Sequence, residues 1–426
     1  MCCLSMHWPI GFFRDCAHPF LSHLRCCMPL LPLTPSEGRA WPEGCRRVGH
    51  QGDAAASIAA MAPWLDQDVL PDVLLVLAAT RTAEQEGISA AGATAAARRT
   101  TAVADAELLL KGPSVAPRWP LPMLPAGVSP ALLSHAVVAR LGLQPQVAAV
   151  GLMCQPDFDH VRLESPDLGP AECLSSGAAM PLERVNYLWR QGEQLGAGLQ
   201  RPLVLAECVP GGTTTAQAVL TALGFEVGDL ISGSARQPPH RLKSALVAQG
   251  LQRAGLIRGC GAEAVLAAVG DPFQVVAAGL LVGAARSQQP LLLGGGSQML
   301  AVLALALHAL PKTAGASLLR QVLVGTTAWL ADEGASDGGI SPLDRLVDSI
   351  GARFGASLAV FASGVHFHAS AHQALRDYEL GHVKEGVGAG GLLLLAQLKG
   401  VSRRGLVDHC DQAMDQLISR PVTSIS

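Results

Sequence analysis

The sequence predicts an α/β protein: a three-layer, Rossmann-like domain with a mainly parallel sheet, plus a small accessory helical part. Short continuous apolar runs, such as DVLLVLAAT (72–80) and QVAAVGL (146–152), are typical of strands that are buried on both faces. Segments with helical composition, such as TAAARRTTAVADAELLL (94–110), separate these runs. Strands that alternate with helices favour a parallel sheet with right-handed crossovers.

Turn and capping residues define the elements in chain order. The stretch GPSVAPRWPLPMLPAGVSP (112–130) is rich in proline and is therefore expected to be a loop. The helix that follows has Ser129 as its cap, Pro130 at its first position and Gly142 near its end. The expected elements are strands at 72–80, 146–152, 202–209, 290–293, 321–325 and 357–361, and helices at 94–110, 129–143 and 180–199.

The composition argues against two classes of partner. A formal net charge of −3, with 2 Tyr and 9 Phe in 426 residues, provides neither the basic footprint nor the stacking platforms of a nucleic-acid-binding protein. The apolar stretch MLAVLALALHALP (299–311) is shorter than the roughly 20 residues that span a membrane. We therefore expect neither a nucleic-acid nor a membrane partner.

The N-terminal region differs from the rest of the chain. Residues 1–60 carry Pro, Trp and His without periodicity, and they lack the pattern of a signal peptide. We expect a poorly ordered extension over 1–60 and one α/β domain over 61–426. Six of the cysteines lie near the N-terminus: Cys2, Cys3, Cys16, Cys26, Cys27 and Cys45. Disulfide frameworks are typical of short secreted chains, so we expect reduced thiols and a cytoplasmic location here. No two cysteines form a C-x-x-C pair, so we expect no metal site.

The first glycine-rich turn lies in ECVPGGTTTAQAVLTALG (207–224), where Gly211 and Gly212 join a predicted strand to a predicted helix. Thr213 and Thr214 stand at the helix start, where free backbone N–H groups, hydroxyls and the helix dipole favour an anion. Glycine also lets the backbone approach a phosphate closely. The turn is a candidate phosphate site, and a capped helix after a tight turn is the alternative.

Two further turns have the same construction. PLLLGGGSQML (290–300) places three glycines between a strand and a helix. GHVKEGVGAGGLLLLAQL (381–398) places Glu385 among glycines. A carboxylate in a dry pocket can act as a general base, whereas an ordinary solvated glutamate is the alternative.

Four other polar residues are candidates. Glu207 ends an apolar strand, and a buried glutamate needs a polar partner, for which a ligand hydroxyl is one candidate. Lys243 is a candidate phosphate cation, against the alternative of a solvated helix lysine. His366 and His368 are expected on one side of a strand, and without a nearby carboxylate trio we favour polar packing over metal binding.

Taken together, these segments resemble the nicotinate-nucleotide–dimethylbenzimidazole phosphoribosyltransferase family, most closely its cyanobacterial and archaeal branch. The resemblance covers about residues 70 to 415. It rests on EQEGISAAGATAAARRTTAVADAELLLKGP (84–113), ECVPGGTTTAQAVLTALG (207–224), GDPFQVVAAGLLVGAARSQQPLLLGGGSQMLAVLAL (270–305) and EGVGAGG (385–391).

The resemblance implies a reaction. The ribose phosphate of nicotinate mononucleotide would move to a nitrogen of 5,6-dimethylbenzimidazole or a related base, giving α-ribazole phosphate for the lower ligand of cobalamin. It implies one general base, no cofactor and no metal, and it suggests a homodimer.

The resemblance also implies roles for individual residues. Glu385 matches the catalytic glutamate of the family's Glu-Gly-x-Gly segment, and Glu207 matches the glutamate that precedes its Gly-Asn-Thr-Thr turn. The expected phosphate and ribose residues are Glu207, Gly211, Gly212, Thr213, Thr214, Lys243, Gly294, Gly295, Gly296, Gly386 and Gly388, and the expected base-binding residues are Glu86, Gly87 and Ser89.

Departures from the family pattern leave alternatives open. Glu84-Gln85 stand where the family has Asp-His, and Gly212 stands where it has Asn. The accepting base could therefore be adenine or another benzimidazole. Two further functions stay open: a nucleotide-binding protein without transferase activity, and a nicotinate mononucleotide hydrolase in which Glu385 activates water.

Overall fold

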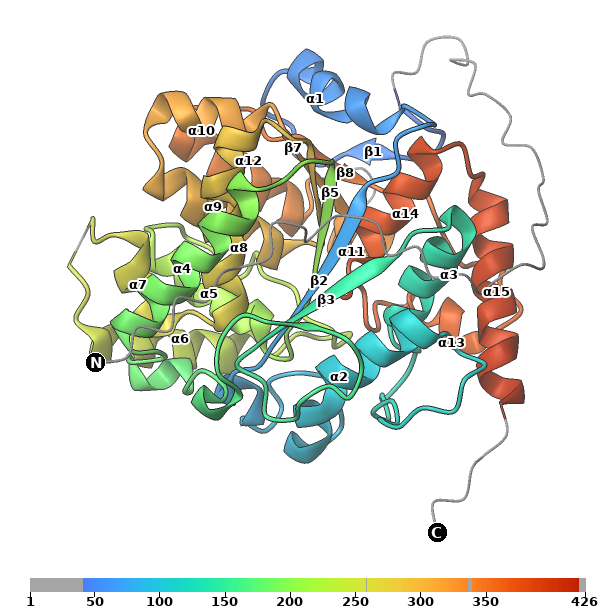
Figure 1. The fold of residues 1–426 in the computed structure, drawn as a ribbon, viewed down its shortest axis with the longest axis horizontal. Helices are drawn as coiled ribbons and strands as arrows, with labels where there is room; N and C mark the ends of the chain where they lie inside the picture. Colours follow the sequence, from blue (N-terminus) through green and yellow to red (C-terminus); the bar gives the residue numbers. More distant parts are fainter. Residues whose placement is uncertain (1–40, 258, 336–338, 421–426) are drawn as a thin grey trace.

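The computed structural model describes residues 41–257, 259–335 and 339–420, and an eight-stranded sheet lies at its centre (Figure 1). The strands are β1 (Arg46–Arg47), β2 (Asp72–Ala78), β3 (Pro145–Val150), β4 (Val161–Arg162), β5 (Leu203–Cys208), β6 (Leu291–Gly294), β7 (Val322–Thr326) and β8 (Val360–Ala362). Their order across the sheet is β1-β8-β7-β6-β5-β2-β3-β4. Only β1 runs antiparallel to its neighbour, so the predicted mainly parallel sheet is confirmed.

Helices cover both faces of the sheet and complete the predicted three layers (Figure 1). One face is covered by α4 (Leu182–Ala197), α5 (Gly212–Ala222), α6 (His240–Ala254), α7 (Ala262–Val269), α8 (Pro272–Ser287), α9 (Ser297–Ala309), α10 (Lys312–Leu319) and α12 (Pro342–Phe354). The other is covered by α1 (Ala54–Met61), α2 (Ala95–Lys111), α3 (Ala131–Leu141), α13 (Gln373–Arg376), α14 (Ala389–Leu398) and α15 (Arg403–Ser419), and the short α11 (Ala328–Ala331) contributes to both cores.

Strand β2 shows why the apolar runs are continuous. Leu74 and Val76 face the core on one side of the sheet, whereas Leu75 and Leu77 face the core on the other. Successive side chains of a strand point to opposite faces, so a strand between two helical layers needs an apolar residue at every position. None of the helices in the described part of the chain is long and apolar enough to cross a membrane.

The end of β8 corrects one prediction. The strand stops at Ala362, because the Gly364 N–H donates to the side chain of Gln397 at 2.8 Å instead of to a neighbouring strand. His366 and His368 therefore lie in the loop after β8, and the prediction that they project from a strand is wrong.

The direction of chain winding reverses between β2 and β5. From β2 the chain moves outward through β3 and β4, whereas from β5 it moves outward on the other side through β6, β7 and β8. In open parallel sheets the crevice beyond the carboxyl ends of the strands at such a switch point is the usual ligand site. Glu207 is the second-to-last residue of β5, directly at this point.

The segment from residue 41 to α1 belongs to the fold, which corrects the second part of the predicted extension over 1–60. Strand β1 pairs with β8, and Trp41 packs edge-on against Phe361 with ring centroids 5.4 Å apart. Asp53 caps α1 by accepting the Ala55 N–H at 2.8 Å. Residues 1–40 lie outside the described part of the chain.

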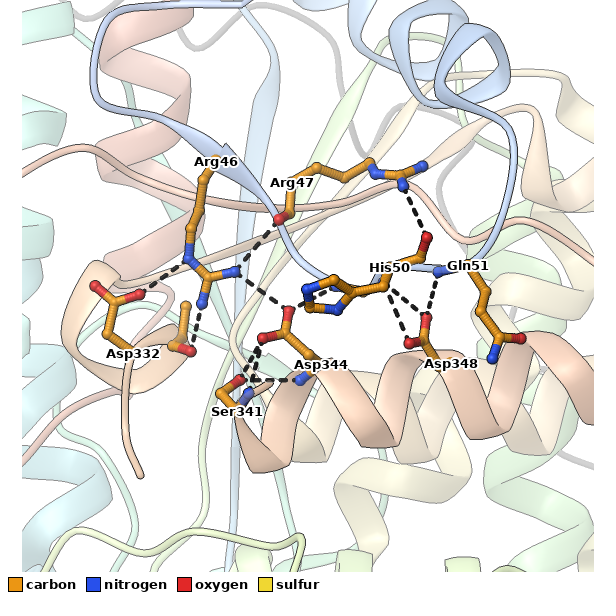
Figure 2. A network of polar contacts seen from close by, with 10 residues as sticks. Arg46, Arg47, His50, Gln51, Asp332, Ser341, Asp344 and Asp348 are labelled. Carbon is orange, nitrogen blue, oxygen red and sulfur yellow. Dashed lines mark hydrogen bonds and ion pairs between the residues drawn. The ribbon is translucent and has the colours of Figure 1, made fainter. Parts of the chain in front are cut away.

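Polar contacts fix this segment to α12 (Figure 2). Arg46 bonds to Asp332 at 2.9 Å and to Asp344 at 3.2 Å. Asp344 also accepts the Gly49 N–H, and Asp348 accepts the backbone N–H groups of His50 and Gln51 (Figure 2). Isolated sequence motifs do not reveal such contacts, because their partners are almost 300 residues apart in the chain.

Candidate active site

A cavity of about 950 Å³, counted with the solvent at its mouth, opens at the switch point. The end of β5, the starts of α5 and α9, and the segment around Glu385 all reach it. The three glycine-rich turns of the sequence therefore meet in one place.

The turn after β5 has the conformation that its glycines allow. Gly211 has φ +84°, which L side chains rarely adopt, and Gly212 begins α5. A Cβ at Gly212 would lie 1.8 Å from Oε1 of Gln298, so a larger residue there would displace the Gln298 amide. Gly212 and Thr213 line the cavity, and the positive end of the α5 dipole points there.

The start of α9 faces the same space. Gly296, Ser297 and Gln298 line the cavity from the opposite turn. Two helix N-termini thus converge on one volume, and each favours negative charge. Behind them, the buried hydroxyl of Thr214 has no hydrogen-bond partner within the described protein.

Glu207 is buried at the floor of the cavity. One carboxyl oxygen accepts the side-chain N–H of Gln298 at 2.9 Å. Burial, together with the nearby carboxyls of Asp271 and Glu385, raises the pKa of Glu207 to about 8. At neutral pH this group is largely protonated, so it can both donate to and accept from a ligand hydroxyl.

Asp271 supports this floor from below. Its side chain caps α8 in a capping box with Gln274, and it accepts the Thr215 hydroxyl at 2.5 Å. Burial raises the pKa of Asp271 to about 6. Because Thr215 belongs to the first turn of α5, the capping box of α8 also fixes the turn that carries Thr213.

Glu385 lies deep in the cavity and is held by four donors. One carboxyl oxygen accepts the Thr326 hydroxyl and the Thr327 N–H, both at 3.1 Å. The other accepts the N–H groups of Gly386 at 3.1 Å and Gly390 at 3.0 Å. Burial raises the pKa of Glu385 to about 7, although these hydrogen bonds oppose the shift. A carboxyl with a pKa near neutrality is suited to general base catalysis.

The backbone around Glu385 is strained. Val383, Lys384 and Val387 have φ values of +66°, +70° and +52°, which cost energy for residues with a Cβ and most of all for valine. Such strain persists only where surrounding contacts over-determine the backbone. The segment 383–387 meets that condition through several buried partners.

Those partners come from three segments of the chain. The Lys384 carbonyl accepts Trp329 Nε1–H at 2.5 Å and the Thr327 hydroxyl at 2.7 Å. The Val387 carbonyl accepts the Ser134 hydroxyl at 2.8 Å, and the Val383 N–H donates to the Ser234 carbonyl at 2.9 Å. The orientation of Glu385 is therefore fixed before any ligand enters.

Two buried lysines support one wall of the cavity. Lys384 pairs with Glu333 at 2.6 Å and donates to the carbonyls of Gly233 and Ala235 at 3.0 and 2.9 Å. Lys243 donates to the Ser232 carbonyl at 2.6 Å, and burial followed by the nearby Lys384 charge lowers the pKa of Lys243 to about 7. The alternative of a solvated Lys243 is wrong, because the 232–235 segment covers its ammonium group.

An apolar wall lies beside Glu385. It consists of Pro122, Leu124, Pro130, Val383 and Val387. Asp105 lines the same cavity, accepts the Ser129 hydroxyl at 2.6 Å and has its pKa raised to about 6 by burial. The arrangement can hold a flat apolar ring with a carboxyl at its edge.

The structure gathers some of the predicted site residues and separates others. Those that line the cavity are Ser89, Glu207, Gly211, Gly212, Thr213, Gly296, Glu385 and Gly386. Those that do not are Glu86, Gly87, Thr214, Lys243, Gly294, Gly295 and Gly388. Glu86 and Gly87 are exposed to solvent, away from the cavity.

Close packing of backbone explains two of the glycines outside the cavity. A Cβ at Gly294 would lie 2.9 Å from Cα of Gly388, and a Cβ at Gly388 would lie 2.7 Å from Cβ of Ala206. The start of α14 therefore packs closely against β6 at Gly294 and against β5 at Ala206, and both glycines allow this packing. Neither lines the cavity.

Sequence reasoning missed several cavity residues. Lys384 directly precedes Glu385, and Gln298 follows the Ser297 that begins α9, so both were within reach of motif analysis. Asp105 is an acidic residue in the largely apolar second half of α2, where Glu107 is the other, and this is also a readable signal. Thr326 gave no signal, because its role depends on β7 lying next to the Glu385 segment.

Relatives of the chain are found among cyanobacterial proteins, although no family model matches it. It is 61% identical over 395 residues to a UPF0284 protein of Parasynechococcus marenigrum strain WH8102, which covers 93% of this chain and 100% of that one. It is 56% identical over 393 residues to a UPF0284 protein of Prochlorococcus marinus strain MIT 9313, with 92% and 98% covered.

Solved structures share the fold. The crystal structure of CobT from Thermus thermophilus superposes with a TM-score of 0.53 at 19% identity, over 84% of this chain and 92% of that one. A crystal structure of the nicotinate-nucleotide–dimethylbenzimidazole phosphoribosyltransferase from the same organism gives a TM-score of 0.53 at 18% identity, with 84% and 91% covered. At this identity the likeness establishes a shared fold.

Proposed function

The chain belongs to the UPF0284 family, and from its site we propose that it is a phosphoribosyltransferase, which moves the ribose phosphate of nicotinate mononucleotide to 5,6-dimethylbenzimidazole or a related base. The product would be α-ribazole phosphate, and nicotinate would be released. The fold shared with the phosphoribosyltransferase of Thermus thermophilus agrees with this proposal.

The observation that carries the proposal is the environment of Glu385. The carboxyl has a pKa of about 7, lies beside an apolar wall and is held by four donors in a fixed orientation. The accepting base must lose one N–H proton as its nitrogen attacks. A preoriented carboxylate at a neutral pKa is suited to accept that proton.

Bond changes in the proposed step balance without a further reactant. The bond from ribose C1′ to the nicotinate nitrogen breaks, and its electron pair returns to the pyridine ring, which leaves neutral at the ring nitrogen. The unprotonated ring nitrogen of the base forms the new bond to C1′ with its lone pair, and the N–H proton on the other ring nitrogen passes to Glu385. Glu207, largely protonated, would hold a ribose hydroxyl.

The phosphate would bind between the two helix starts. Thr213 at the start of α5 lines this space, as do Ser297 and Gln298 from α9. The dipoles of both helices favour the phosphate charge there. Lys243 would act from behind the 232–235 segment, without direct contact.

The apolar wall beside Glu385 helps to distinguish the transferase from a hydrolase. Pro130, Val383 and Val387 offer apolar surface to a flat ring, whereas a hydrolase needs a small wet site beside Glu385. This surface favours a transferase, which we further propose to be a cytoplasmic homodimer.

Release of nicotinate from nicotinate mononucleotide by the purified protein tests the proposal. The assay is run without a base and with dimethylbenzimidazole, other benzimidazoles and adenine. Release that requires one base would support the transferase and identify its acceptor. Release without a base would replace it with a hydrolase, and bound nucleotide without any release would leave a binding protein.

A further inference from the structure

Three polar side chains outside the cavity meet at the surface behind the Glu385 segment. His366 Nδ1 lies 3.1 Å from a carboxyl oxygen of Glu379, and His368 Nε2 lies 3.4 Å from the same oxygen. The three ligand atoms lie within 4.8 Å of one another. Sequence reasoning favoured polar packing for these histidines because it lacked a carboxylate, and the fold supplies one.

Buried aromatic residues fix the three side chains in place. Phe367 lies between the two histidines in sequence, and Tyr378 directly precedes Glu379. The rings of Phe367 and Tyr378 are fully buried and lie 6.0 Å apart, edge to face. Packing of these two rings brings the loop after β8 against the segment that leads to Glu385, and it places the three polar groups on one surface.

Glu379 is oriented toward the histidines by the backbone. Its second carboxyl oxygen accepts the Phe367 N–H, so only the first faces the imidazoles. Burial alone would raise the pKa of Glu379, but the hydrogen bonds from His366 and from Phe367 hold it below its usual range. Asp332 adds negative charge nearby, which Arg403 partly opposes.

The distances agree with a coordination shell. Ligand atoms of a tetrahedral zinc ion, with bonds of about 2.0–2.2 Å, lie about 3.3 Å apart. His366 Nδ1 and Glu379 are 3.1 Å apart, which is close to that value, whereas the 3.4 Å from His368 Nε2 changes when its ring turns toward the ion. Two imidazoles and one carboxylate are typical of zinc and of other divalent transition metals.

We propose that His366, His368 and Glu379 bind one divalent transition-metal ion, which ties the loop after β8 to the segment that leads to Glu385. The ion has three protein ligands and an open position toward solvent. This site is separate from the proposed transferase chemistry and does not depend on it.

Binding requires one side-chain movement. The two imidazole rings are stacked, with their planes 5° apart, whereas a shared ion must lie near the plane of each ring. His368 has 75% of its side chain exposed, so its ring can rotate without repacking the core. His366 and Glu379 keep their positions.

Titration of the tag-free, full-length protein with Co²⁺ tests the site. We expect one equivalent to give a visible spectrum of nitrogen and oxygen ligands, without the near-ultraviolet charge-transfer band of thiolates. Loss of an outer-shell partner typically weakens a metal site about 10–100-fold, so His366→Ala and His368→Ala should each weaken binding by at least about 100-fold. Zn²⁺ should raise the Tm of the wild type and of neither variant.

His372→Ala is the matched control, because His372 pairs with Asp415 instead and lies outside the cluster. It should bind Co²⁺ as the wild type does. Binding of equal strength in all four proteins, or a thiolate charge-transfer band that locates the ion at cysteines, would overturn the proposal. So would the absence of saturable binding in a folded wild-type protein.

Discussion

The Val387 N–H donates to the Glu207 carbonyl at 2.9 Å, so the two proposed site glutamates are connected through the backbone. Val387 lies two residues after Glu385, and Glu207 lies near the end of β5. This hydrogen bond adds one backbone contact between the end of β5 and the loop that carries Glu385. It sets the distance between the proposed base and the ribose side of the cavity before substrate arrives.

Glu385→Gln tests the base. The amide keeps the size of the side chain but cannot accept a proton, so nucleotide binding should persist while turnover falls about 10²–10⁴-fold. Binding is measured by calorimetry and turnover by nicotinate release. Glu263→Gln is a matched control, because Glu263 lies in the first turn of α7, away from the cavity. Unchanged turnover in Glu385→Gln would remove Glu385 from the mechanism.

The pH dependence follows from the raised pKa of Glu385. A general base acts in its deprotonated form, so kcat/KM should be low at pH 5, rise through about pH 7 and level off above it. An acid-side inflection near the ordinary glutamate pKa of about 4.3 would contradict the assignment. The profile is measured at saturating base, with fold checked by circular dichroism at each pH.

Gly212→Ala tests the phosphate turn. The new Cβ would collide with Oε1 of Gln298, and the flexible amide would move and lose its bond to Glu207. Loss of one such bond costs about 1 kcal/mol, so KM for nicotinate mononucleotide should rise about 5-fold. The variant should also discriminate less between the mononucleotide and its dephosphorylated riboside, which the wild type should bind much more weakly.

Gly228→Ala is the control for that variant. A Cβ at Gly228 would meet only the Ser244 hydroxyl, at an ordinary contact distance of 3.7 Å. Its KM should match that of the wild type. A Gly212→Ala enzyme with wild-type KM, or a wild type that binds nucleotide and riboside equally, would move the phosphate elsewhere.

Lys384→Met tests the support of the strained loop. The change removes the ammonium that neutralises Glu333 and that satisfies the carbonyls of Gly233 and Ala235. Breaking a buried pair by removing one partner typically costs about 3–5 kcal/mol, so the free energy of unfolding should fall by about 3 kcal/mol. Chemical denaturation measures it. Lys312→Met, on α10 and exposed, should leave it unchanged.

Local chemistry in the sequence was enough to predict the fold and the two central glutamates. The apolar runs of β2 and β5 required a sheet covered on both faces, and Glu385 and Glu207 stand out as carboxyls beside glycine-rich turns. Gly294 and Gly388 do not line the cavity, and a glycine that allows backbone packing has the same sequence signature as one that approaches a phosphate. Only the tertiary contact between β6 and α14 distinguishes the two.

The remaining differences also arise from contacts between distant segments. Burial of Lys243 depends on the 232–235 segment folding over α6, and the His366 cluster depends on two buried rings that bring Glu379 beside it. Neither the burial of Lys243 nor the position of Glu379 beside the histidines produces a periodic pattern or a motif in the sequence. Residues 41–53 contain short polar stretches whose partners lie on α12, so their composition resembled that of an unstructured tail.

Strand β1 has a protective role that follows from its place in the sheet. It is the outermost strand, so without it the backbone N–H and C=O groups of β8 would be open to a strand from another molecule. A protein begun at Met61 would keep the whole cavity but expose this edge. We expect such a truncated protein to self-associate and to be poorly soluble, whereas the chemistry of its site should be unchanged.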